Sequence, residues 1–356
     1  MIKKKMMVLS GAILFGVLTC GCGSTGIQAD TTVSEEANEH TLAETPIVAE
    51  NEIEKEQEQV QEESFDPSEV YEAFLNNEEV AEISFDADQG YYSSYKETLE
   101  DGKSYTLDEI AQGLKSGINV FLESNDDIEI SKTRNAYIDC GNDGQNELLV
   151  AVKFKAPMDT YENKMIFKAT KDGLKLCYCG DSWSRKSLAV NEYGYIETTS
   201  SGGAYDSSYE KSYVDAEGSW HFLYGNVAEY AERGELWYGS TKYVYSDYGI
   251  DMSDLLIFSY YFEKTDDESE PEYLYTYAKM GEYGKANEVP YFDVSIVKDN
   301  VLYETGNMYK DFFDQIGMKV YSTTDMAALV EKQLQNEGFD SSLAEGKVVL
   351  ETEVDF

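Results

Sequence analysis

Histidine is the scarcest residue of this sequence: there are two, His40 and His221, among 356 residues. Catalytic arrangements of the Ser-His-Asp and Cys-His kinds, and metal sites rich in histidine, therefore have at most one candidate base. Gly-x-Ser-x-Gly, His-Glu-x-x-His and Walker motifs are absent as well. The sequence therefore nominates no catalytic residue.

Basic residues are also few, with 28 Lys and Arg against 69 Asp and Glu and a formal net charge of −41. A chain this acidic repels polynucleotides and anionic lipid surfaces, which indicates that nucleic acid is not a partner. Cationic peptides, polyamines, neutral glycans and divalent ions remain open as partners. The charge also favours a soluble monomer.

Long apolar runs are limited to the start of the chain, where three lysines at positions 3–5 precede the apolar segment 6–18. This order is typical of an export signal, and the segment is too short for a spanning helix, which needs about 20 residues. Gly21 and Cys22 follow it, and a cysteine after a small residue is typical of a bacterial lipoprotein signal. We therefore expect residues 1–21 to be a signal peptide.

Cys22 would then carry the lipid, palmitate included, and anchor the chain at the extracytoplasmic face of the cell membrane. Cys20 fits less well, because the branched Thr19 precedes it. An uncleaved anchor or a plain signal peptide with two incidental cysteines is the alternative.

Residues 22–64 contain no Phe, Tyr or Trp and one lysine, and glutamate is dense from position 50 onward. Too few apolar groups are present to offset the entropy of ordering a chain. We expect an acidic, disordered stalk that lifts the remainder away from the bilayer.

Residues 65–356 carry the signals of one globular α+β domain, dominated by antiparallel sheet, with helices near its start and end. Predicted helices begin after the caps Asp66 and Thr106, and a third spans about 324–337 before Gly338. Period-two segments with short turns predict two hairpins, 165–169 with 174–179 and 209–214 with 220–224. The acidic loop 264–271 is either a domain boundary or a long hairpin connection.

The sharpest motif is the loop that starts at Asp139, which resembles the calcium-binding Asp/Gly loops of the FG-GAP type. The resemblance implies that the ligands are the carboxylates of Asp139, Asp143 and Glu147 and the backbone carbonyl of Gln145. Gly141 occupies the third position of the loop, where such loops normally have a ligand. The loop would hold Ca²⁺ at millimolar affinity. The alternative is a hairpin turn in which these residues serve only turn geometry.

Several further stretches, together with this loop, resemble a group of surface lipoproteins of Gram-positive anaerobes that has no assigned activity. The stretches lie at 71–75, 138–144, 191–196, 201–204 and 317–338. The resemblance implies a lipid-anchored surface protein and leaves its chemistry open.

Cys140, Cys177 and Cys179 remain within the domain. Cys177 and Cys179 lie two apart on a predicted strand, so both should point to the same face and pair poorly with each other. One disulfide from Cys140 to either of them and three reduced, buried thiols are both compatible with the sequence.

Tyrosine is abundant, with 29 residues, and Tyr273, Tyr275 and Tyr277 fall on one face of a predicted strand. They form either an exposed stacking surface for sugar rings or an extended peptide, or half-buried cross-strand pairs.

The sequence leaves two functions open for this protein. The first is a non-enzymatic binding or interaction module at the cell surface. The alternative is a carbohydrate hydrolase, which needs two carboxylates about 5 to 9.5 Å apart in a groove flanked by aromatic residues.

Overall fold

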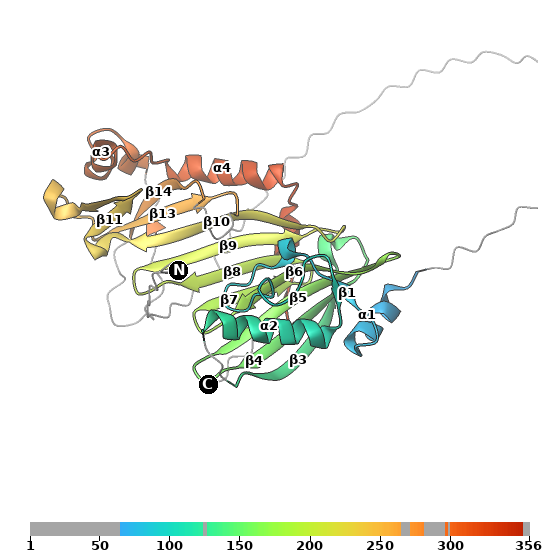
Figure 1. Ribbon diagram of the computed structural model, residues 1–356. Coiled ribbons are helices and arrows are strands. Elements are labelled where there is room, and N and C mark those ends of the chain that lie inside the picture. Colours follow the sequence, from blue (N-terminus) through green and yellow to red (C-terminus); the bar gives the residue numbers. More distant parts are fainter. Residues whose placement is uncertain (1–64, 124–126, 265–270, 281–295, 298–299, 352–356) are drawn as a thin grey trace, which may run out of the picture. The chain divides into compact units, whose positions relative to one another are not determined.

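The computed structural model describes residues 65–123, 127–264, 271–280, 296–297 and 300–351 (Figure 1). This part is β-dominated α+β, with antiparallel sheets and with helices near its start and end, as the sequence predicts. The predicted signal peptide, 1–21, and stalk, 22–64, lie outside the described residues.

The first sheet has six strands within the described residues, in the order β2-β1-β6-β5-β4-β3. They are β1 (Ala81–Glu82), β2 (Ser104–Tyr105), β3 (Glu129–Ile138), β4 (Glu147–Lys155), β5 (Thr160–Thr170) and β6 (Gly173–Ser182). Neighbouring strands run antiparallel, except for β1 and β6, which are parallel.

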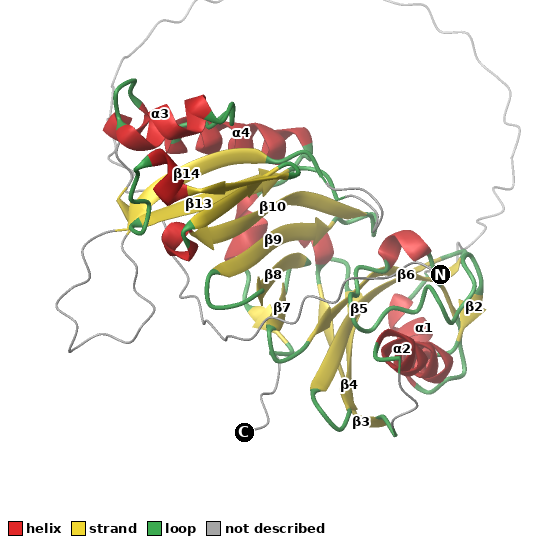
Figure 2. Cartoon of the chain, turned by 60° about the vertical axis from the view of Figure 1, so that its left-hand side comes forward, coloured by secondary structure: helices red, strands yellow, loops and turns green. Residues whose placement is uncertain are grey.

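Two helices cover one face of this sheet, α1 (Pro67–Leu75) and α2 (Leu107–Phe121) (Figure 2). Both begin where the sequence predicts. Asp66 accepts the N–H of Ser68 ahead of α1, and a reciprocal capping box joins Thr106 and Glu109 ahead of α2. Their apolar faces pack on side chains of β4, β5 and β6, so that burial of one face stabilises both helices.

The second sheet has eight strands within the described residues, in the order β15-β14-β13-β10-β9-β8-β7-β16. They are β7 (Lys186–Asn191), β8 (Tyr195–Ser201), β9 (Asp206–Val214), β10 (Trp220–Tyr230), β13 (Leu255–Tyr261), β14 (Leu274–Met280), β15 (Ile296–Val297) and β16 (Val348–Val349). A two-stranded sheet of β11 (Glu235–Tyr238) and β12 (Thr241–Val244) and the helices α3 (Met308–Gln315) and α4 (Thr323–Asn336) complete this part (Figure 1).

The two large sheets share a core. Leu149 and Ile166 of the first sheet belong to one buried cluster with Val190 and Ile196 of the second. Strand β4 is therefore buried on both faces, which explains its nearly continuous apolar sequence. Lys164 is fully buried in this region, and its ammonium group donates to the carbonyl of Leu188 at 2.9 Å.

Both predicted hairpins are confirmed, as β5 with β6 and β9 with β10. The third predicted helix is α4, after which Gly338 adopts a positive φ of 66°. Strands β13 and β14 pair antiparallel, so the acidic loop between them is a hairpin connection; its residues 265–270 lie outside the described part. The sequence analysis did not predict α3, whose apolar face spans only eight residues.

The prediction that Cys177 and Cys179 share a face is wrong. A register shift opposite Ile166 and Phe167 leaves Cys177 as an extra residue in β6, and a β-bulge of this kind reverses the alternation of side chains. Cys179 consequently packs towards α1 and α2, whereas Cys177 joins Cys140 in the core between the sheets. All three are buried free thiols, and burial raises the pKa of each.

Candidate functional site

The Asp139 loop connects β3 to β4 as a hairpin turn. The carboxylate of Asp139 accepts the backbone N–H of Asp143 at 2.8 Å and that of Gly144 at 3.1 Å. Asp143 accepts the N–H of Gln145 at 2.8 Å. Gly141 and Gly144 have φ angles of 75° and 86°, which other residues adopt only at a cost. These hydrogen bonds are those of turn geometry.

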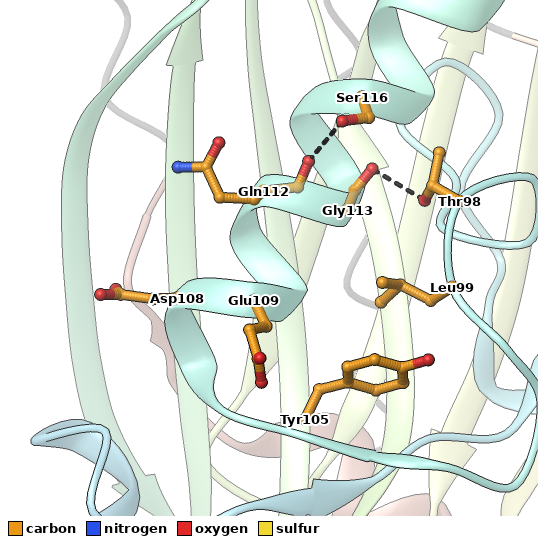
Figure 3. A pocket seen from close by; sticks show the side chains of 8 residues that line it. All are labelled: Thr98, Leu99, Tyr105, Asp108, Glu109, Gln112, Gly113 and Ser116. Atoms are coloured by element: carbon orange, nitrogen blue, oxygen red, sulfur yellow. Dashed lines mark hydrogen bonds between the residues drawn. The ribbon is translucent and has the colours of Figure 1, made fainter.

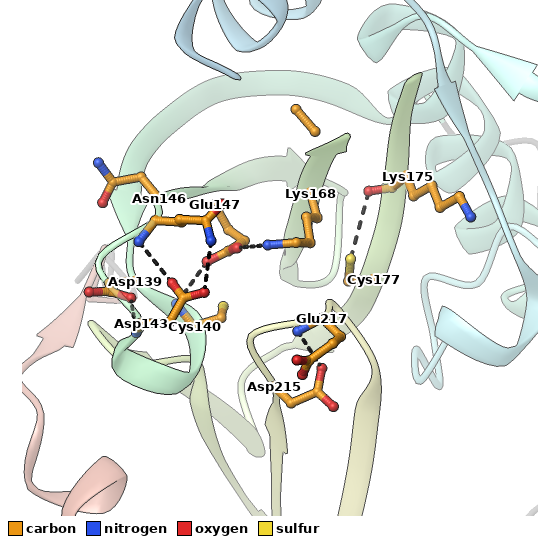
Figure 4. Close-up of polar contacts among 12 residues, drawn as sticks. Asp139, Cys140, Asp143, Asn146, Glu147, Lys168, Lys175, Cys177, Asp215 and Glu217 are labelled. Carbon is orange, nitrogen blue, oxygen red and sulfur yellow. Dashed lines mark hydrogen bonds and ion pairs between the residues drawn. The ribbon is translucent and has the colours of Figure 1, made fainter. Parts of the chain in front are cut away.

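Glu147, the last of the predicted calcium ligands, points away from solvent (Figure 4). One carboxylate oxygen lies 2.5 Å from the Lys168 ammonium nitrogen, and the other accepts the N–H of Cys140 at 2.8 Å. Burial raises the pKa of Glu147 despite these bonds. Burial alone would lower the pKa of Lys168, but the hydrogen bond to Glu147 raises it.

The predicted ligands therefore do not converge on one point. Among the residues that the structure describes, no group of three or more His, Cys, Asp or Glu side chains could hold a metal ion. Calcium binding by Asp139, Asp143, Gln145 and Glu147 stays a prediction, and the contacts of these residues favour the alternative of a structural turn.

The tyrosine face of β14 is turned inward. Tyr277 has no exposed surface, donates its hydroxyl to the carbonyl of Leu302 and packs on Phe313 with ring centroids 4.9 Å apart. Tyr275 packs against the same core. For Tyr275 and Tyr277 the structure supports the buried interpretation, because Tyr238 of β11 packs on the first and α3 covers the second. Tyr273 precedes β14 and pairs with Tyr261, with ring centroids 5.9 Å apart.

A depression of about 560 Å³ lies beside α2 (Figure 3) and contains two carboxylates. It is lined by Thr98, Leu99, Tyr105, Asp108, Glu109, Gln112, Gly113 and Ser116. Asp108 and Glu109 are consecutive on the helix and so point in different directions, and Glu109 accepts the N–H of Thr106 as part of the capping box. They do not form the facing pair that a glycoside hydrolase needs.

Aromatic residues also gather around the end of α2 and the turn between β6 and β7, where two of them are exposed and the others pack on the core of the first sheet. We name the aromatic cluster Tyr91, Tyr92, Phe121, Tyr161 and Trp183. The ring of Tyr92 is its centre, 4.1 Å from Phe121, 4.6 Å from Trp183 and 5.8 Å from Tyr161 between centroids. Tyr91 lies 5.4 Å from Phe121, and these two are 62% and 39% exposed. The sequence analysis missed this cluster, because its members are far apart along the chain.

A buried carboxylate holds the loop that carries Tyr91 and Tyr92. Asp181 accepts the backbone N–H groups of Tyr91, Tyr92 and Ser93 on one oxygen, at 2.9, 2.6 and 3.1 Å. Its other oxygen receives Lys186 at 2.7 Å, and the side chain has no exposed surface. Four charge-assisted hydrogen bonds on one carboxylate make this loop rigid although it has no helix or strand.

Asp88 holds the loop in the same way. It accepts the N–H of Gly90 and of Tyr95 and the hydroxyl of Ser94. Burial raises the pKa of Asp88, while these bonds act against that rise. Segment 88–95 is thus fixed by two carboxylates.

Comparisons with models of protein families, with curated proteins and with solved structures found no match to this chain. The resemblance to surface lipoproteins therefore stays a prediction. Among the described helices, none has the length and apolar character needed to cross a membrane.

Replacing Asp139 by alanine tests whether the loop is a structural turn or a metal site. We expect the free energy of unfolding to fall by about 1 kcal/mol in chelator and in millimolar calcium alike, because two N–H groups lose their acceptor in both buffers. Urea unfolding measures the change, with Asp172→Ala, in the exposed β5–β6 turn, as the control. A loss seen only in calcium would show that the loop is a metal site.

Replacing Asp181 by asparagine should lower the free energy of unfolding by about 3 kcal/mol, because an amide cannot accept three N–H groups and an ammonium group at once. Urea unfolding followed by tryptophan fluorescence measures the effect, and Asp172→Asn is the control of equal charge change. A loss no larger than that of the control would show that the carboxylate does not hold the loop.

Proposed function

We propose that this chain is a binding protein rather than an enzyme, attached to the outer face of the cell membrane through lipid on Cys22. In this proposal the stalk 22–64 presents the domain 65–356 to ligands outside the cell. The order of charge, apolar segment and small residues before Cys22 supports the anchor. The aromatic cluster supports the binding function, and it is the observation on which the proposal rests.

The chemistry of the cluster favours a neutral glycan. Sugar rings present apolar C–H faces that pack on aromatic rings, and Tyr91 and Phe121 offer exposed ring surface side by side. The hydroxyl groups of Tyr91 and Tyr92 form no hydrogen bond with other described residues, so they are free to bind sugar hydroxyls.

An extended peptide fits this surface less well. Peptides bound in extended form normally add a strand to a free sheet edge. The members of the aromatic cluster come from a loop, a helix end, the interior strand β5 and a turn, and these do not form such an edge. The acidity of the chain further disfavours anionic polymers.

The rigidity of segment 88–95 supports binding as well. A surface whose rings are already fixed loses little conformational entropy when a ligand arrives, and affinity rises accordingly. Asp181 and Asp88 supply this rigidity from beneath the loop. They contribute by holding Tyr91 and Tyr92 in place, without contacting the ligand.

The glycan proposal predicts that Tyr91→Ala weakens binding at least tenfold, because the most exposed ring of the cluster is lost. A panel of neutral polysaccharides assayed with the purified mature protein identifies the ligand, and titration calorimetry measures affinity. Trp237→Ala is the matched control, since Trp237 is 58% exposed on β11, outside the cluster. Failure of every polysaccharide to bind, or equal binding by Tyr91→Ala, would overturn the proposal, and binding of a peptide alone would assign the surface to peptides.

The anchor is tested separately. We expect Cys22→Ala to move the protein from the membrane fraction into the medium, because no residue is left to carry lipid at that position. Cys20→Ala is the control and should leave the protein in the membrane fraction. Membrane retention of Cys22→Ala together with release of Cys20→Ala would assign the lipid to Cys20.

A further inference from the structure

A cavity of about 520 Å³ lies between α4 and the second sheet, apart from the aromatic cluster. Strands β10, β13 and β14 form its floor and α4 its roof. It is lined by Tyr224, Phe258, Tyr260, Thr276, Ala278, Thr323, Met326, Ala327, Val330, Glu331, Leu334 and Ser341. Its size is within the range of small-molecule sites, which is about 300 to 1,000 Å³.

The roof is fixed at its ends but leaves space beneath its middle. Ser322 caps the start of α4 by accepting the N–H of Asp325, and the Tyr213 hydroxyl donates to the carbonyl of Glu337 at the other end. Along the helix, Met326 is the one side chain that is buried. Val330 and Leu334 are only half-buried, so the helix does not pack tightly on the sheet.

The walls of the cavity are mainly apolar, with three aromatic rings on the floor. Tyr224 and Tyr260 lie with ring centroids 6.2 Å apart, and burial raises the pKa of both. Neither hydroxyl forms a hydrogen bond with another described residue. The hydroxyl of Thr276 is engaged by Tyr303 at 2.9 Å. Two phenol groups are thus left for a ligand.

Glu331 is the one charged side chain among the lining residues. Lys211, on the neighbouring strand β9, lies 6.0 Å from the Tyr224 ring centroid and 3.3 Å from the carboxylate of Glu197, which balances its charge. Aromatic faces and a lone carboxylate together attract ammonium groups, while apolar walls take an apolar body.

We propose that this cavity is a second ligand site, independent of the glycan surface, and that it takes an organic amine with an apolar, ring-sized body. The ammonium group pairs with Glu331 at the helix. The body packs between the floor rings and Met326, Val330 and Leu334.

The test uses tryptamine as the cationic probe and indole as its neutral counterpart, titrated into the purified protein by calorimetry. We expect tryptamine to bind at least fivefold more tightly than indole. Glu331→Gln should remove this difference by weakening tryptamine alone, because the variant keeps the shape of the side chain and loses the charge.

A pair of variants on neighbouring helix positions tests the location. Ala327 lines the cavity, whereas Ala328 does not, and both are exposed on α4. We expect Ala327→Trp to weaken tryptamine at least tenfold by filling the space, and Ala328→Trp to leave it unchanged.

Three results would overturn the proposal: no binding of tryptamine at millimolar concentration, equal affinity for tryptamine and indole, or equal effects of Ala327→Trp and Ala328→Trp. Each result is independent of the glycan assay, because these substitutions lie outside the aromatic cluster.

Discussion

The carboxylate of Asp181 joins parts of the chain that no sheet or helix holds together. It receives three backbone N–H groups from the loop at Tyr91 and, on its other oxygen, the ammonium group of Lys186. Lys186 begins β7, the first strand of the second sheet, and pairs with Trp183 across the turn from β6. This buried charge therefore contributes both to the position of the aromatic cluster and to the passage of the chain from one sheet to the next.

The carboxylates of the Asp139 loop, whose sequence resembles a calcium loop, all have partners within the protein. Lys168, on β5, supplies the positive charge that Glu147 requires when it is buried. Asp139 and Asp143 accept backbone N–H groups of the same turn. The local motif does not reveal this positive charge, because the charge comes from a strand outside the motif.

Features that depend on neighbours in sequence could be predicted, and features that depend on distant contacts could not. The caps at Asp66 and Thr106 and the hairpin turns are local, and they lie where the sequence places them. The bulge at Cys177 follows from the register of β5 against β6, which no single strand encodes. Segment 88–95 has neither helical nor strand periodicity, so its hydrogen bonds to Asp88 and Asp181 had no signal in the sequence.

The pairing of β16 with β7 has a consequence for the order of folding. Val348 and Val349 form the outer neighbour of β7, and the backbone of Lys347 bonds to Glu192 beside them. This edge of the second sheet has no partner until the segment around residue 349 has docked on β7. An open edge can pair with other chains. Slow docking of β16 would therefore prolong the time during which the edge of β7 can pair with other chains.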